Sequence, residues 1–279
     1  MKFKKPIIWM TCIAFVCIVA LAVTQPILIK AILAKYKSTD HFLVLQTDDR
    51  IRYEVSAEQN AIILSGILSD SQDAVMRALN ANFNKPVAIY VCASQESFNE
   101  YVFLSKNVRG AVYWGKLFLS PGAFSRGSVK KLTIHELTHY LFYTHLGEKA
   151  HIQGVPLWFR EGVAEFVANG GADYTIDKDV FGQMSDKERD AYLSGKLNFW
   201  FFTQNATDAL SAGGTVNWLL YRVGGLFVHF MHDLNPKAFD RLITLLLSGV
   251  DFSEALQESY GQNTDSLLNE FTLYLSQKV

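Results

Sequence analysis

The segment HELTHYLFYTH, residues 135–145, contains the residues best suited to metal chemistry. His135 and His139 are four residues apart, so on an α-helix both imidazoles lie on one face. Imidazole nitrogens are common zinc ligands, and a catalytic zinc keeps three protein ligands and a water. Glu136 follows the first histidine and is expected beside the metal, where a general base for the water belongs. The pattern therefore predicts Zn²⁺ on His135 and His139, with Glu136 as a catalytic residue.

The third histidine of this segment is not the expected third ligand. His145 falls six residues after His139, as in the metzincin pattern H-E-x-x-H-x-x-G-x-x-H. That pattern needs its glycine to turn the chain back, and Phe142 occupies the glycine position here. On a continuous helix, six residues rotate the side chain by about 600°. We therefore expect His145 away from the metal, near the helix C-terminus, where its charge suits the helix dipole.

A second acidic segment downstream offers an alternative ligand. The run PLWFREGVAEF, residues 156–166, predicts an amphipathic helix that begins at Pro156. It contains Glu161 and Glu165, and Glu161 lies 22 residues after His139. This separation is enough for a helix end, a turn and a returning helix. Two antiparallel helices could then bring a carboxylate to the open side of the imidazoles.

The two segments together resemble a known family. H-E-x-x-H followed by W-x-x-E-G-x-A-E (158–165) resembles the gluzincin metallopeptidases, in particular the peptidase MA-like group. It is similar, more distantly, to the M1 aminopeptidases. The resemblance is close over residues 128–166, extends to residues 221–279, and is faint before Arg109. It implies that Glu161 is the third zinc ligand and that the chain has a zincin-like fold.

Three more residues acquire roles through this resemblance. Gly162 would allow close helix packing, and Glu165, one turn after Glu161, would hold a ligating histidine in place. The alternative for Glu165 is a solvated glutamate on a helix. The run YRVGGLFVHFM (221–231) resembles the family's Y-x-x-G segment, which implies that the Tyr221 hydroxyl stabilises the oxyanion during catalysis. A tyrosine of the core or of an interface is the alternative.

The run RGAVYWG, residues 109–115, is the expected substrate-binding strand. An edge strand here could pair with the backbone of a peptide, through Gly110, Ala111, Val112 and Tyr113. The aminopeptidases carry a glutamate in the corresponding segment, which binds the free amine of the substrate. No acidic residue lies between Gly110 and Pro121. This difference favours an endopeptidase.

The expected activity is zinc-dependent hydrolysis of a peptide or protein. Zinc on His135, His139 and Glu161 would polarise the water and the scissile carbonyl, and Glu136 would pass the water proton to the leaving amine. Two alternatives stay open. One is a membrane-tethered binding module without catalysis, and the other is a zinc amidase that acts on cell-wall peptides.

The order of elements predicts an α+β fold. Strands are expected at residues 41–47, 85–94 and 110–122, the last on an edge, and a helix at 56–83. Ser128 is the expected N-cap of the helix that carries the histidines, and helices then continue to Val279. The expected architecture is a small mixed α/β half and a mostly helical half, with an active-site cleft between them. Residues 35–279 form one domain in this interpretation.

The N-terminus predicts export from the cytoplasm. MKFKK is basic, and the run from Pro6 to Ile29 has no charged residue, which favours a single membrane anchor with the domain on the extracytoplasmic side. The alternative is a signal peptide cleaved after the ALA run at residues 20–22, which would leave a periplasmic or secreted protein. In both interpretations, the anchor or signal segment comprises residues 1–34.

Composition argues against nucleic-acid binding, and the remaining cysteines and histidines are not expected to bind the metal. A net charge of −1 with mixed acids and bases gives no basic patch for nucleic acid. Cys12 and Cys17 lie in the N-terminal run, and Cys92 is expected as a small core residue of a buried strand. Three other histidines have no spacing that fits the site and are expected as structural or surface residues: His151, His229 and His232.

Overall fold

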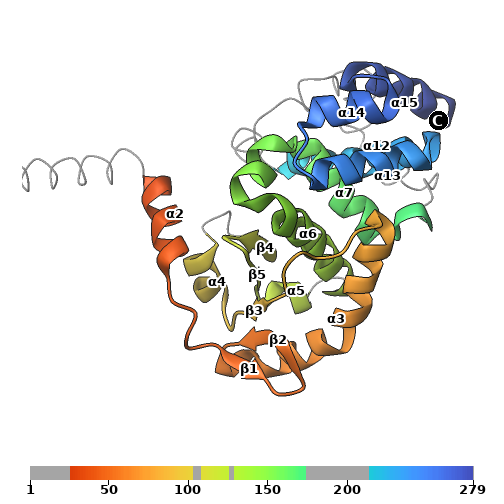
Figure 1. Ribbon diagram of the computed structural model, residues 1–279. Coiled ribbons are helices and arrows are strands. Elements are labelled where there is room, and N and C mark those ends of the chain that lie inside the picture. The colour runs from red at the N-terminus through yellow and green to blue at the C-terminus, as the bar shows by residue number, and fades with distance from the viewer. Residues whose placement is uncertain (1–25, 103–107, 126–128, 174–213, 279) are drawn as a thin grey trace, which may run out of the picture.

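A computed structural model describes residues 26–102, 108–125, 129–173 and 214–278. It confirms the α+β class, with a five-stranded sheet in the N-terminal half and helices in most of the remainder. In Figure 1 the sheet lies at one end of the molecule and helices α13 to α15 lie at the other, with helix α6 between them.

The sheet places one strand at an edge beside the helices. Its order is β1-β2-β3-β5-β4. The bounds are Leu43–Leu45 (β1), Asp48–Tyr53 (β2), Ile89–Val91 (β3), Gly110–Tyr113 (β4) and Lys116–Leu119 (β5). The pairs β2–β3 and β3–β5 are parallel, whereas β1–β2 and β4–β5 are antiparallel. The predicted edge position is therefore confirmed for β4.

The prediction of one strand at residues 110–122 is wrong. The segment folds into a hairpin whose turn contains Trp114 and Gly115, both with positive φ values, 49° and 75°. Two-residue hairpin turns with positive φ at both positions match the right-handed twist of the strands they join. Similarly, the strand expected at 41–47 is only the first part of the β1–β2 hairpin.

Helices cover both faces of the sheet. The alternation of side chains sends Ile89 and Val91 into the main core, where helices α3 (Glu58–Leu79) and α6 (Val129–Gly154) pack. Tyr90 and Cys92 point to a second, smaller core under helix α4 (Gln95–Tyr101). Cys92 is fully buried, so its predicted place in the core is confirmed.

The helix that carries the histidines, α6, is interrupted at a glycine. Gly147 has φ 76° and ψ 169°, which interrupts α6 before its last segment. The predicted break after His145 is thus confirmed, while Ser128, the expected N-cap, lies outside the described residues. Helix α7 (Leu157–Ala168) follows, with Pro156 as its N-cap. The predicted returning helix is therefore present.

The remaining helices are described by their bounds. They are α2 (Pro26–Tyr36), α5 (Gly122–Ser125), α12 (Gly214–Leu234), α13 (Pro236–Leu247), α14 (Phe252–Tyr260) and α15 (Thr264–Lys278), with short 3-10 turns at Val55–Ala57 and Gly171–Asp173. Of the helices within the described ranges, none is long and apolar enough to cross a membrane. The predicted anchor lies outside these ranges up to residue 25.

Helices α7 and α12 meet backbone to backbone. A Cβ on Gly162 would lie 2.5 Å from the Gly224 carbonyl oxygen, and a Cβ on Gly224 would lie 2.9 Å from the Trp158 oxygen. Neither contact leaves room for a methyl group. Because Glu161 and Tyr221 flank this crossing in the chain, the two glycines fix how far apart these side chains lie.

We expect Gly162→Ala to destabilise the fold. The added methyl group has to push two helix backbones apart, and overpacking of this kind costs about 1–3 kcal/mol in the free energy of unfolding. Urea denaturation of both proteins measures the difference. Gly66→Ala is the matched control, because nothing lies within 4 Å of a Cβ at this helical position. That control should gain roughly 0.5–1 kcal/mol, and equal effects of the two substitutions would contradict the prediction.

Candidate metal centre

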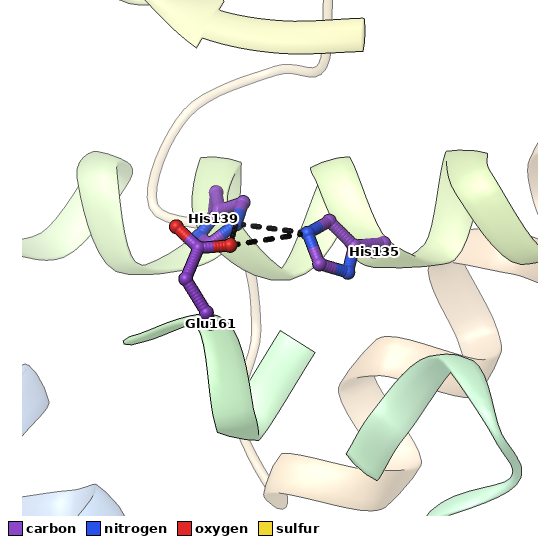
Figure 2. A group of neighbouring side chains, drawn as sticks. All are labelled: His135, His139 and Glu161. Carbon is purple, nitrogen blue, oxygen red and sulfur yellow. Dashed lines mark hydrogen bonds and ion pairs between the residues drawn. The ribbon is translucent and has the colours of Figure 1, made fainter. Parts of the chain in front are cut away.

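Two imidazoles and one carboxylate meet between helices α6 and α7. The Nε2 atoms of His135 and His139 are 3.2 Å apart on one face of α6. The Oε2 atom of Glu161 lies 3.5 Å from the first of them and 3.3 Å from the second. Figure 2 shows the carboxylate rising from α7 toward both rings. The predicted proximity of Glu161 to the histidines is therefore confirmed.

The spacing of these three atoms fits a tetrahedral zinc ion. Zinc binds histidine nitrogen and carboxylate oxygen at about 2.0–2.2 Å, so two ligands at a tetrahedral angle lie roughly 3.3 Å apart. The three observed separations range from 3.2 to 3.5 Å. A set of two imidazoles and one carboxylate also matches the chemistry of catalytic zinc sites, which leave a fourth position open. The residues thus fit the ion that the sequence predicts.

The charges at this site favour a cation. Burial alone would raise the pKa of Glu161, but the charge of His139 and hydrogen bonds with His135 and His139 hold that pKa well below its usual range. Burial likewise opposes the charged form of His135, yet hydrogen bonds to Glu161 and Glu165 raise its pKa above the ordinary value. A histidine binds a metal through its neutral imidazole, so protonation of these rings would compete with a metal ion at this site.

Glu165 holds the other nitrogen of His135. Its Oε1 atom is 3.2 Å from His135 Nδ1, so the ring presents Nε2 to Glu161 while Nδ1 is engaged. The second oxygen of Glu165 accepts a hydrogen bond of 3.2 Å from the Asn169 amide, and Lys131 Nζ lies 3.8 Å from it. A carboxylate in this position fixes the tautomer and the orientation of a metal-binding imidazole.

We expect Glu165→Gln to weaken zinc binding by roughly 10- to 100-fold, the loss typical when such an outer partner is removed. The neutral amide has nearly the same volume, but without the negative charge it stabilises a proton on His135 Nδ1 less strongly. Competition with a chromophoric zinc chelator measures the affinity. Lys149→Gln, at an exposed position of α6, is a control for removal of a surface charge. An affinity for zinc equal to that of the wild type would contradict the role of Glu165.

Glu136 lies beside these three residues, under the edge strand β4. Its side chain is 6% exposed, and a Cβ on Gly110 of β4 would lie 2.8 Å from Glu136 Cγ. Only glycine allows the strand to approach the carboxylate so closely. Burial raises the pKa of Glu136, although the charges of His135 and His139 lower it. A carboxylate with a raised pKa is a stronger base, as a general base needs to be.

The other residues of β4 differ in burial. Ala111 is buried, whereas Val112 and Tyr113 are partly exposed. The strand pairs with β5 through one edge. Gly110 lies close to Glu136, and a role of the strand in binding a peptide stays a prediction.

Helix α12 brings Tyr221 to the same place. Its ring centroid is 5.8 Å from that of His135. The charge of Glu161, burial and the charge of Glu136 raise the pKa of Tyr221 well above its ordinary value. The hydroxyl therefore keeps its proton at neutral pH and can donate a hydrogen bond.

No protein-family model matches the sequence, and no curated protein matches it. What the site can do is therefore inferred from its own geometry and chemistry.

His145 is directed away from the site, as predicted. Its Nε2 atom is 2.8 Å from the carbonyl oxygen of Asn82, and its Nδ1 atom is 3.0 Å from the side-chain amide of Asn84. These contacts join α6 to the loop after α3. His145 thus contributes to the packing of the fold.

Two residues lie near the site although the sequence did not predict them there. His151 is only 7% exposed, and its ring centroid lies 5.8 Å from that of His139, so of the two predicted possibilities, structural or surface, the structural one holds. Arg160 donates hydrogen bonds to the carbonyls of His151 and Ile152. No regular spacing predicts this neighbourhood, because the chain folds back after Gly147. His229 is also buried and pairs with Asp233 on α12, at 3.1 Å.

Proposed function

We propose that the protein is a zinc-dependent metallopeptidase that hydrolyses peptide bonds. The observation that carries the proposal is the triangle of His135, His139 and Glu161, whose ligand atoms have the separations of a tetrahedral zinc site. A site for structural zinc needs no further carboxylate. Here Glu136 is buried on α6 and lies under the edge strand β4, where a substrate and a water could meet it.

The protein residues have distinct tasks in this proposal. Zinc, when bound, would polarise the scissile carbonyl and make a water molecule more acidic. Glu136 accepts the proton of the attacking water and returns it to the leaving nitrogen. The Tyr221 hydroxyl donates a hydrogen bond to the oxygen on which negative charge develops. Glu165 keeps His135 in its metal-binding orientation.

The edge strand supplies the means of holding a peptide. Among the described strands, β4 pairs with β5 alone, so its other edge can accept a peptide in an extended conformation. The contact of Gly110 with Glu136 brings that edge to the catalytic carboxylate. Without an acidic residue on this strand to bind a free amine, cleavage within a chain is favoured over removal of its first residue.

The proposed location follows from the N-terminal run. We infer that residues 1–34 anchor the protein, or direct its export, and that the catalytic domain acts on the extracytoplasmic side. Substrates are then peptides or proteins of that compartment.

Metal analysis and peptide hydrolysis of the full chain test the proposal. We expect one zinc ion per chain and cleavage of a mixed peptide library, with cleavage lost on chelation and restored by added zinc. Zinc without any peptide cleavage would contradict the proposal and favour a binding module. Cleavage confined to cell-wall peptides would instead favour the amidase. Cleavage that persists in metal-free protein would exclude the zinc mechanism.

A further inference from the structure

A buried arginine lies directly before the ligand Glu161. Arg160 is 7% exposed. Its Nη1 atom donates hydrogen bonds of 3.2 and 2.8 Å to the carbonyl oxygens of His151 and Ile152. These carbonyls belong to the last turn of α6, which otherwise lacks intrahelical donors for them. The guanidinium is therefore held in one position by a single one of its nitrogens.

The rest of this guanidinium has no partner in the described part of the chain. Neither Nε nor Nη2 has an acceptor there, and no carboxylate there forms an ion pair with it. These two nitrogens are not among the fully buried side-chain atoms that lack a hydrogen-bond partner, so they remain accessible from outside the protein core. Burial lowers the pKa of Arg160, and the nearby charge of Glu161, with smaller contributions from Tyr221 and Glu148, opposes this effect without reversing it. However, Glu161 is engaged with two imidazoles, so beside the site lies a cation whose Nε and Nη2 donors are not engaged by any residue of the described ranges.

The arrangement of the hairpin brings a bound peptide toward this cation. Gly110 lies against Glu136 and Gly115 lies against Tyr143, so the β4–β5 hairpin follows α6 from the catalytic carboxylate toward the kink at Gly147. The chain after that kink returns His151 to within 5.8 Å of His139, ring to ring. Arg160 binds this returning segment. A peptide along β4 would thus extend from Glu136 toward the side on which Arg160 lies.

The geometry points to Arg160 as a specificity-determining residue that binds a carboxylate of the peptide substrate near the scissile bond. This inference rests on the proposed function. The planar guanidinium offers parallel N–H donors that match the two oxygens of a carboxylate. The carboxylate could be the C-terminal group of a peptide or the side chain of an Asp or Glu. The first source would make the enzyme act near chain ends, and the second would make it select acidic sequences.

Three peptides distinguish these sources in a binding assay with metal-free full-length protein. They are N-acetyl-Ala-Ala-Phe with a free carboxylate, the same peptide as its C-terminal amide, and N-acetyl-Ala-Glu-Phe amide. Because the protein is free of metal, a carboxylate cannot gain affinity by binding zinc. We expect one of the two carboxylate peptides to bind at least about tenfold more tightly than the neutral amide, as for a hydrogen-bonded charge pair. Tryptophan fluorescence gives the dissociation constants.

Two variants separate recognition from a structural role. Arg160→Gln should abolish the preference for the carboxylate. Arg160→Lys keeps the positive charge but lacks the two parallel N–H donors of the guanidinium, and it should retain part of the preference. Arg77→Gln removes an exposed arginine of α3 and should leave the preference unchanged. If Arg160 only caps α6, Arg160→Gln lowers the melting temperature but the preference persists, and this overturns the inference.

The wild-type protein alone can also overturn it, should all three peptides bind equally. Hydrolysis by the zinc-loaded protein is measured separately. Its absence would contradict the proposed peptidase, while the preference of the metal-free protein would still decide the role of Arg160.

Discussion

Replacement of Glu136 by Gln should leave zinc bound and reduce peptide hydrolysis by about 10²- to 10⁴-fold, the contribution typical of a general base. The amide has nearly the shape of the carboxylate, so it still fits under Gly110 and creates no cavity. It cannot accept a proton from water. The three ligand atoms belong to other side chains, so the affinity for metal should stay within a few-fold of the wild type.

The measurement pairs zinc content with the rate of hydrolysis on the same preparation. Glu254→Gln is the matched control, since Glu254 is an exposed residue in the first turn of α14. It should change neither quantity. A Glu136→Gln protein that cleaves peptides as fast as the wild type would exclude Glu136 as the base, whatever the metal content.

How much of the site the sequence predicts depends on the range of the interactions. The facing of His135 and His139 is a local consequence of helix geometry, and the helix itself follows from its apolar pattern. The position of Glu161 depends on how helices α6 and α7 cross. Its separation from His139 in the sequence permits a contact with the histidines but does not require one. The resemblance to gluzincins singled out this residue, and the geometry agrees with that choice.

The residues missed near the site are those that depend on a long-range fold-back. Arg160 belongs to the segment W-x-x-E-G, but its hydrogen-bond partners are backbone carbonyls after the kink at Gly147. Every residue has a backbone carbonyl, so the sequence does not indicate which of them accepts a hydrogen bond from Arg160. His151 is brought beside His139 by the same fold-back. A single glycine in the pattern indicates that the helix breaks, but not in which direction the chain continues.

The sheet shows a similar limit. The strand β2 has the sequence DDRIRY, in which Ile51 and Tyr53 are buried and the charged residues are not. This alternation is too short to predict a strand, and the neighbouring LVL of β1 is more apolar. The hairpin turn at Trp114 and Gly115 has none of the usual Asn-Gly or Asp-Gly signals. A bulky residue with positive φ is rare, so the pattern favoured one continuous strand.

Replacement of Glu161 by Gln should remove stable zinc binding and, with it, all hydrolysis. An amide oxygen carries no full charge and binds zinc less strongly than a carboxylate does. The expected loss of affinity exceeds the roughly 10- to 100-fold loss expected for Glu165, since outer partners act only through the ligand that they orient. The substitution also removes the negative charge that faces His135 and His139.

Three variants in one competition titration with a zinc chelator rank these effects. The affinity should fall most for Glu161→Gln, less for Glu165→Gln and not at all for Glu254→Gln. Circular dichroism must show that Glu161→Gln keeps its helices, and the similar volume of the amide favours this result. Glu161 is the one predicted ligand that comes from a different helix than the two histidines. The order of these affinities therefore tests the part of the site that depends on how the two helices pack. If Glu161→Gln binds zinc as tightly as the wild type, another group completes the site, and the carboxylate of α7 has a role other than metal binding.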